Sequence, residues 1–265
     1  MTQEKNTAWL LGIFSQAREL SLEAGNMIRK QWPLASSVTH KDRIDLVTET
    51  DVAVEKFLTE RLLELVPDST MMAEESYSGE PLGEWTWIID PIDGTTNFVH
   101  RHPFVAISIA LCHNGRIVTG IINAPMLNEC YWAVRGHGAF VNETRLHVSQ
   151  TRALDQSMIA FGIPYTIDKD LDAWISRFYP VLPQAQAMRR CGAAAIDLSY
   201  VAAGKYDGFY EAGLRPWDAA AGWLLVEEAG GCVTRYNGEP YYLGSYDIVA
   251  TNSLIHRELT GLLIP

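Results

Sequence analysis

The sequence predicts a mixed α and β protein in which layers of helix alternate with layers of sheet. Two amphipathic helices open the chain, and a run of short strands separated by tight turns follows them. From about residue 155, strands and helices take turns. Separate runs of helices and strands are typical of α+β folds, and alternation is typical of α/β units. We therefore predict a layered α/β sandwich in two parts, residues 1–154 and 155–265, with a cleft between them.

The first two elements are expected to be helices. Apolar side chains recur at helical spacing from about Thr7 to Lys30, and Pro33 ends the pattern. A loop with charged residues at 41–43 follows. A second helix is expected to begin near Thr50 and to end before Pro67.

The rest of the first part is expected to form a largely antiparallel sheet. Asn114-Gly115 between two apolar runs is the strongest short signal for a hairpin, and Gly136-His137-Gly138 predicts another turn. Strands are predicted at 70–73, 85–90, 104–113, 116–123, 129–134 and 139–141.

The second part is expected to consist of βα units, because helical and strand patterns alternate there. Strands are predicted at 157–161, 207–211, 232–236 and 248–251, and helices at 171–179, 192–203, 217–229 and 254–263.

Composition excludes several classes of function. The chain has 265 residues, 48% of them hydrophobic, and a formal net charge of -11, which argues against nonspecific binding to nucleic acid or to an anionic membrane. The short apolar run Ala8–Phe14 lacks a preceding basic segment, so neither a signal peptide nor a membrane span is expected. The four cysteines lack metal-ligand spacing and are expected to be reduced thiols, which fits a cytoplasmic protein.

The most informative stretch is Trp87–Asn97, in which an apolar run ends in two acids, Asp90 and Asp93. Ligands of open α/β folds gather at the carboxyl ends of strands. Two carboxylates this close repel each other unless a cation or a proton intervenes, and oxygen ligands suit Mg²⁺. The stretch therefore predicts a metal site, although acids that only shape a turn would also fit it.

Three further places offer acids at the ends of predicted elements. Asp51 and Asp218 stand where helices begin, and Glu74 and Glu75 follow the strand at 70–73. Each acid has a simpler explanation, since the first two could complement a helix dipole and the glutamates could be solvated loop residues. Their joint placement favours one shared site.

Together these motifs resemble the inositol monophosphatase family of magnesium-dependent, lithium-sensitive phosphatases, which are related to fructose-1,6-bisphosphatase. The resemblance covers essentially the whole chain and implies the αβαβα sandwich of that family. It rests on residues 45–51, 74–76, 90–98, 217–222 and 227–231.

The resemblance also implies the roles of the acids. Glu74, Asp90 and the carbonyl oxygen of Ile92 resemble the ligands of a first Mg²⁺, and Asp90, Asp93 and Asp218 resemble those of a second. Asp90 would bridge the two ions. A third, weaker Mg²⁺ would use Glu74, with Asp51 assisting through water. Thr95 resembles the hydroxyl that orients the attacking water together with Glu74.

The substrate implied is a phosphorylated polyol, with myo-inositol 1-phosphate as the first choice. Backbone amides of Gly94 and Thr95 are expected to hold the phosphate, and Asp93, Gly192, Ala194 and Glu211 are expected near the polyol. Histidinol phosphate, fructose 1,6-bisphosphate and the 3'-phosphate of an adenosine bisphosphate stay open as alternatives. Glu211 could also be a surface acid, and Gly192–Ala194 could simply be a closely packed helix start.

The resemblance further implies a homodimer. Some bacterial relatives act as partners of the transcription machinery, and Arg189, Arg190 and Arg215 could contribute to such a surface. The acidic balance argues against direct contact with nucleic acid, and the intact set of acids argues against a purely structural role.

Overall fold

A computed structural model describes residues 3–34, 38–40 and 46–264, so the predicted loop at 41–43 lies outside the described residues. The helices are α1 (Gln3–Gln31), α2 (Glu49–Leu65), α3 (Thr95–Val99), α4 (Ile167–Val181), α5 (Ala194–Ala202), α6 (Pro216–Glu228) and α7 (His256–Leu263). Three short 3₁₀ helices cover Trp32–Leu34, Pro125–Leu127 and Leu154–Gln156.

In the described part of the chain, the strands fall into three sheets. A two-stranded sheet pairs β1 (Val38–His40) with β2 (Leu46–Thr48). The seven-stranded sheet contains β3 (Thr70–Ala73), β4 (Trp85–Asp93), β5 (Ala106–His113), β6 (Arg116–Ala124), β7 (Glu129–Val134), β8 (Ala139–Val141) and β9 (Thr144–Arg145). The five-stranded sheet contains β10 (Met158–Phe161), β11 (Ala187–Arg189), β12 (Gly208–Ala212), β13 (Cys232–Thr234) and β14 (Asp247–Thr251).

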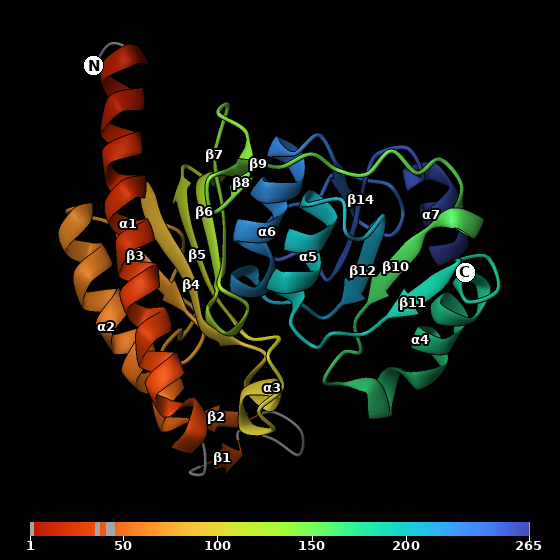
Figure 1. Ribbon diagram of the computed structural model, residues 1–265, viewed down its shortest axis with the longest axis horizontal. Coiled ribbons are helices and arrows are strands. Elements are labelled where there is room, and N and C mark those ends of the chain that lie inside the picture. The colour runs from red at the N-terminus through yellow and green to blue at the C-terminus, as the bar shows by residue number, and fades with distance from the viewer. Residues whose placement is uncertain (1–2, 35–37, 41–45, 265) are drawn as a thin grey trace.

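Figure 1 shows these elements as five layers. Helices α1 and α2 cover one face of the seven-stranded sheet, and α5 and α6 lie between that sheet and the five-stranded one. Helices α4 and α7 cover the far side. The predicted αβαβα sandwich is therefore confirmed.

Each predicted strand is present in one of the two larger sheets. In the larger sheet the strands lie in chain order from β3 to β9, with β3 parallel to β4 and the following neighbours antiparallel. Asn114-Gly115 joins β5 to β6 as predicted, because His113 pairs directly with Arg116. The smaller sheet has the order β11-β10-β12-β14-β13, in which β10 is parallel to both of its neighbours.

Small residues bring α6 close to β6 of the larger sheet and to α5 beside it in the central layer. A side-chain carbon at Gly120 on β6 would lie 2.8 Å from the carbonyl oxygen of Ala221 on α6. One at Gly222 would lie 2.5 Å from Leu198 on α5. Helix α6 and the larger sheet therefore approach each other almost backbone to backbone, and α6 packs closely against the Leu198 side chain of α5. One buried cluster contains residues from both parts of the chain. The predicted division at residues 154 and 155 stays a prediction.

Several boundaries differ from the predictions. Strand β4 was expected to end at Asp90 but continues to Asp93, because a register shift between these two residues leaves Pro91 outside the ladder. The short strands β1, β2, β9 and β11 were not predicted, since two or three residues are too few to show a period. Within the described residues, no helix combines the length and apolar character that crossing a membrane requires. All four cysteines are free thiols.

Candidate active site

The irregular end of β4 brings the first acids of the site into the interior. Asp90 is 2% exposed and Asp93 is 9% exposed. The backbone N–H of Ile92 donates to Oδ1 of Asp90 at 2.9 Å, which fixes the turn of the chain between the two acids. The register shift therefore lets both carboxylates stand at the same sheet end, although they are three positions apart.

Asp90 is surrounded by other carboxyl groups. Burial raises the pKa of Asp90 well above its usual range, and the charges of Glu74, Asp93 and Asp218 raise it further. The carboxyl group of Glu74 also lies within hydrogen-bonding reach of Asp90. Two carboxyl groups in contact must share a proton or a cation, so this pair marks a place where positive charge is favoured.

Asp93 belongs to the same group of acids and also contacts α5. Burial, together with the charge of Glu74, raises its pKa to about 7. The backbone N–H of Ala195 opposes this rise by donating to Oδ2 of Asp93 at 2.7 Å. The first turn of α5 is thereby tied to the end of β4.

Asp218 reaches the site from the first turn of α6. Its Oδ2 accepts a hydrogen bond from the backbone N–H of Arg215 at 2.7 Å, an arrangement typical of an acid that caps a helix N-terminus. Ser108 sits directly opposite Asp90 on β5 and donates to the carbonyl oxygen of Trp217 at 2.9 Å. This hydrogen bond anchors the start of α6 beside Asp90, so Asp218 lies within electrostatic range of Asp90 although the two are far apart in the sequence.

Asp51 combines a helix cap with a contact to the site. Its Oδ2 accepts from the backbone N–H of Thr48 at 2.9 Å and contacts the Thr48 hydroxyl, which completes a capping box. Its Oδ1 lies 3.1 Å from Oγ1 of Thr95, which is also 3.1 Å from the carbonyl oxygen of Ile92. Burial raises the pKa of Asp51, and the hydrogen bonds from Thr48 and Thr95 oppose that rise. Helix capping therefore accounts for one carboxylate oxygen of Asp51, while the other oxygen contacts Thr95.

Gly94 and Gly192 meet where the two parts of the chain touch. Gly94 has a φ of 88°, and a side-chain carbon there would lie 2.8 Å from the carbonyl oxygen of Phe104 and 3.3 Å from that of Gly192. The side-chain amide of Asn97 donates to the carbonyl oxygens of Phe104 and Cys191 at 2.7 and 2.9 Å. This amide positions the segment that leads through Gly192 into Ala194 and α5.

Glu211 stands at the carboxyl end of β12. Burial raises its pKa well above the usual range, as do the charges of Asp197, Asp218 and Asp93, while the charge of Arg190 opposes the rise. The residue as a whole is half-buried. Glu211 therefore lies within electrostatic range of two of the predicted metal ligands.

The donor set fits Mg²⁺ in its chemistry. Its members are carboxylate and carbonyl oxygens, which hard divalent cations prefer. As they stand, however, no group of three or more His, Cys, Asp or Glu side chains in the described part of the chain is arranged to hold a metal ion. The fit therefore rests on the contact between Asp90 and Glu74 and on the shared negative charge, and not on a preformed cage.

Three residues that contribute to this region escaped the sequence predictions. Glu55 on α2 is 5% exposed and accepts from the backbone N–H of Glu75 at 2.7 Å. Ala195 holds Asp93, and the buried Asp197 lies two residues further along α5. Glu55 could have been predicted from the sequence because it lies one helical turn after Asp51. Asp197 could have been predicted because it is an acid within the apolar run of α5.

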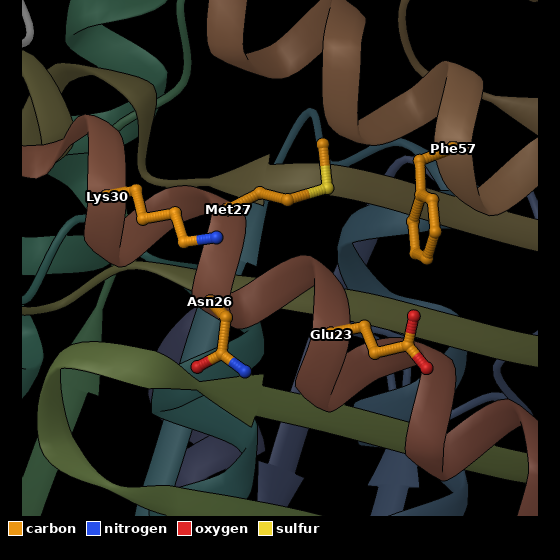
Figure 2. A pocket seen from close by; sticks show the side chains of 5 residues that line it. All are labelled: Glu23, Asn26, Met27, Lys30 and Phe57. Carbon is orange, nitrogen blue, oxygen red and sulfur yellow. The ribbon is translucent and has the colours of Figure 1, made fainter.

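A surface pocket lies elsewhere, on the outer helical layer. Figure 2 shows that it is formed by α1 and α2, with Met27 and Phe57 beside the charged Glu23 and Lys30. None of the acids described above lines it. The candidate active site is therefore the junction of β4, α5, α6 and the start of α2.

Comparison with known proteins agrees with this arrangement. The model of the inositol monophosphatase family matches residues 10–265. The chain belongs to the inositol monophosphatase family. Among curated proteins, it is 42% identical to Nus factor SuhB of Escherichia coli strain K12 over 242 residues, which cover 89% of this chain and 90% of that protein. Nus factor SuhB of Salmonella typhimurium strain LT2 gives the same values.

Solved structures of the family have the same fold. The extragenic suppressor protein suhB from Bartonella henselae superposes with a TM-score of 0.89 at 36% identity, covering 96% of this chain and 98% of that chain. The inositol monophosphatase from Anabaena (Nostoc) sp. PCC 7120 superposes with a TM-score of 0.87 at 35% identity, covering 98% and 96%.

One motif of the family resemblance supports the scaffold in this chain. Glu228, at the end of α6, accepts the backbone N–H groups of Gly136 and Gly138 at 2.8 Å each, and so holds the turn between β7 and β8. Glu227 lies 3.1 Å from Arg135 and accepts from Trp223 at 2.7 Å. These glutamates attach α6 to the larger sheet at the end of the helix opposite Asp218.

Proposed function

We propose that this member of the inositol monophosphatase family is a Mg²⁺-dependent phosphomonoesterase that hydrolyses myo-inositol 1-phosphate to inositol and phosphate. The contact between the carboxyl groups of Asp90 and Glu74, with Asp93 and Asp218 in electrostatic range, is the observation that carries the proposal. Such a cluster is costly unless cations bind it, and a phosphate monoester needs the same cations to react with water.

The residues that would hold Mg²⁺ are Glu74, Asp90, Asp93, Asp218 and the carbonyl oxygen of Ile92, for two or three ions. When bound, Mg²⁺ neutralises phosphate charge, lowers the pKa of the attacking water and stabilises the leaving alkoxide. Asp90 lies within hydrogen-bonding reach of Glu74 and within electrostatic range of Asp93 and Asp218, so its carboxylate would contribute to holding more than one ion.

The hydroxyl of Thr95 is proposed to orient the attacking water. Thr95 donates its single proton either to Asp51 or to the carbonyl oxygen of Ile92, each 3.1 Å away. Its oxygen can then accept a hydrogen bond from the attacking water, because a hydroxyl has two acceptor positions. When Thr95 donates to Asp51, the proton lost by the water would move to the Thr95 oxygen as the Thr95 proton moves to Asp51, and Glu74 would help to orient the water.

The substrate is proposed to lie between β4 and α5. Backbone N–H groups of Gly94 and Thr95 would hold phosphate oxygens, while Gly192 and Ala194 would let the polyol approach the backbone. Glu211 would accept hydrogen bonds from hydroxyl groups of the polyol. Its partial exposure beside the buried acids supports this role.

Mg²⁺-dependent release of phosphate from a panel of monoesters tests the proposal. The panel contains myo-inositol 1-phosphate, histidinol phosphate, fructose 1,6-bisphosphate and adenosine 3',5'-bisphosphate. We expect the highest kcat/KM for the inositol ester, and loss of rate when lithium is added. A higher kcat/KM for any other ester would replace the substrate, and no release from any ester would overturn the phosphatase.

The names of relatives support a second candidate function. Two relatives at 42% identity are Nus factors, so we propose that this chain also acts as a partner of the transcription machinery. Arg189, Arg190 and Arg215 are exposed and could form part of the contact surface. Binding to purified components of the transcription machinery, measured for wild type and for Asp93→Asn, tests this function. Binding that persists after activity is lost would separate the two functions, and no binding by wild type would remove the second one.

We further propose that two copies of the chain associate in the cytoplasm, where the four free thiols would stay reduced. Helix α4 and the residue after it expose an apolar row of Leu171, Ile175, Tyr179 and Leu182, which are 43–71% exposed. A row of this kind is typical of an association surface. Light scattering would give the mass in solution, and a monomeric mass at micromolar concentration would contradict the dimer.

A further inference from the structure

The carboxylate of Glu211 occupies the space in which Gly162 would carry a side chain. A β-carbon built on Gly162 would lie 1.8 Å from Cδ of Glu211 and 2.0 and 2.1 Å from its two carboxylate oxygens. Distances below 3.0 Å are not found for real β-carbons, so the two groups exclude each other.

The sheet brings the two residues together. Strands β10 and β12 are parallel neighbours in which Phe161 pairs with Tyr210, and the backbone N–H of Gly162 donates to the carbonyl oxygen of Tyr210 at 3.1 Å. Gly162 and Glu211 are therefore the next residues along both strands, at their carboxyl ends. Ligands gather at this end of parallel strands.

The backbone at Gly162 does not itself require glycine. Its φ is not among the positive values that glycine adopts in this chain. The residue is buried, and Nε1 of Trp174 on α4 donates to its carbonyl oxygen at 3.0 Å. Hydrogen bonds thus hold both the N–H and the C=O of Gly162, so the backbone is not free to move away from Glu211.

We propose that Gly162 is a specificity-determining residue, because the missing side chain gives the carboxylate of Glu211 its place beside the polyol. The inference rests on the proposed role of Glu211 in binding polyol hydroxyls. Any side chain at position 162 would displace the carboxylate from its present place, which lies within electrostatic range of Asp218 and Asp93. The clash involves the far end of a flexible side chain, so Gly162→Ala is expected to fold.

The test compares two substrates in Gly162→Ala. With myo-inositol 1-phosphate we expect kcat/KM to fall about 10- to 100-fold, mainly through KM, which is the scale of losing hydrogen bonds to a charged group. With para-nitrophenyl phosphate, which has no polyol hydroxyls, we expect a change of less than about 3-fold. Gly12→Ala is the matched control, since a side chain there meets nothing within 4 Å.

A double variant separates an effect through Glu211 from a general disturbance. In a Glu211→Ala background, Gly162→Ala should cause no further loss with the inositol ester, because the displaced group is already absent. The inference would be overturned if Gly162→Ala lowered kcat/KM for the inositol ester as much in that background as in wild type. It would also be overturned if Gly162→Ala lowered kcat/KM equally for both substrates, or if it had the kinetics of wild type. Wild type that hydrolyses only para-nitrophenyl phosphate would overturn the proposed polyol substrate, and the inference with it.

Discussion

Replacing Asp93 by asparagine should stabilise the protein while it abolishes activity. Burial, together with the charge of Glu74, raises the pKa of Asp93 from 3.8 to about 7 in the folded protein. Between these values the folded protein keeps a proton that the unfolded chain has lost. The raised pKa therefore leaves the free energy of unfolding unchanged below pH 3.8. As the pH rises from 3.8 to 7 it lowers the free energy of unfolding increasingly, and above pH 7 the full decrease is present.

The size of this cost follows from the difference in pKa. The raised pKa of Asp93 lowers the free energy of unfolding by up to about 4 kcal/mol at pH 8.5, where the folded carboxyl is ionised, and by up to about 2 kcal/mol at pH 5.5, where it is protonated. Asparagine carries no charge, and its side-chain oxygen can still accept from the backbone N–H of Ala195. We therefore expect Asp93→Asn to gain up to about 2 kcal/mol more at pH 8.5 than at pH 5.5, which is about 4–8 °C in Tm.

Urea denaturation in the presence of EDTA at both pH values measures this gain. Asp172→Asn is the matched control, because Asp172 is exposed on α4. Added Mg²⁺ should then stabilise wild type more than Asp93→Asn, since cation binding to the folded protein relieves the same repulsion. An equal gain at both pH values, or a loss of stability at pH 8.5, would refute the reasoning.

Other outcomes follow from the same contacts. Asp90→Asn should lower the rate of phosphate release by about 100-fold or more at saturating Mg²⁺, the scale on which one electrostatic contact acts in catalysis, and a rate within 3-fold of wild type would contradict the shared site. Asn97→Ala should lower the free energy of unfolding by about 1–3 kcal/mol in urea titrations, because two backbone carbonyls lose their donor, whereas unchanged stability would show that water replaces the amide. Burial lowers the pKa of His256, so below pH 6.5 the unfolded chain binds a proton at this histidine more readily than the folded protein does. Stability measured from pH 7 to pH 5 should therefore fall less steeply in His256→Gln than in wild type, and parallel curves would exclude a role for this histidine.

Long elements of the fold could be predicted from the sequence because their apolar periods extend over many residues. The end of β4 could not, since Pro91 argues against a strand and the register shift that accommodates it depends on pairing with β5. The two-residue strand β9 and the three-residue strand β11 have no period of their own. They exist because neighbouring strands already offer free edges.

The acids of the site could be chosen from sequence, but their geometry could not. Asp51 and Asp218 were expected where helices begin, yet the sequence does not say that one oxygen of Asp51 caps its helix while the other faces Thr95. Glu55 looks like an ordinary helix acid until the loop at Glu75 covers it. Gly162 gave no signal, because its significance depends on a neighbour in a parallel strand.

The contact between Gly120 and Ala221 has a consequence for how the chemistry could be altered. Because β6 and α6 touch through main-chain atoms there, the helix can neither slide nor lift without breaking the packing of the middle layer. A methyl group at position 120 would act as a wedge, shifting Asp218 relative to Asp90 while every acid keeps its identity. The distances between the acidic side chains thus depend on how α6 packs against the larger sheet, and substitutions remote from the acids can change them.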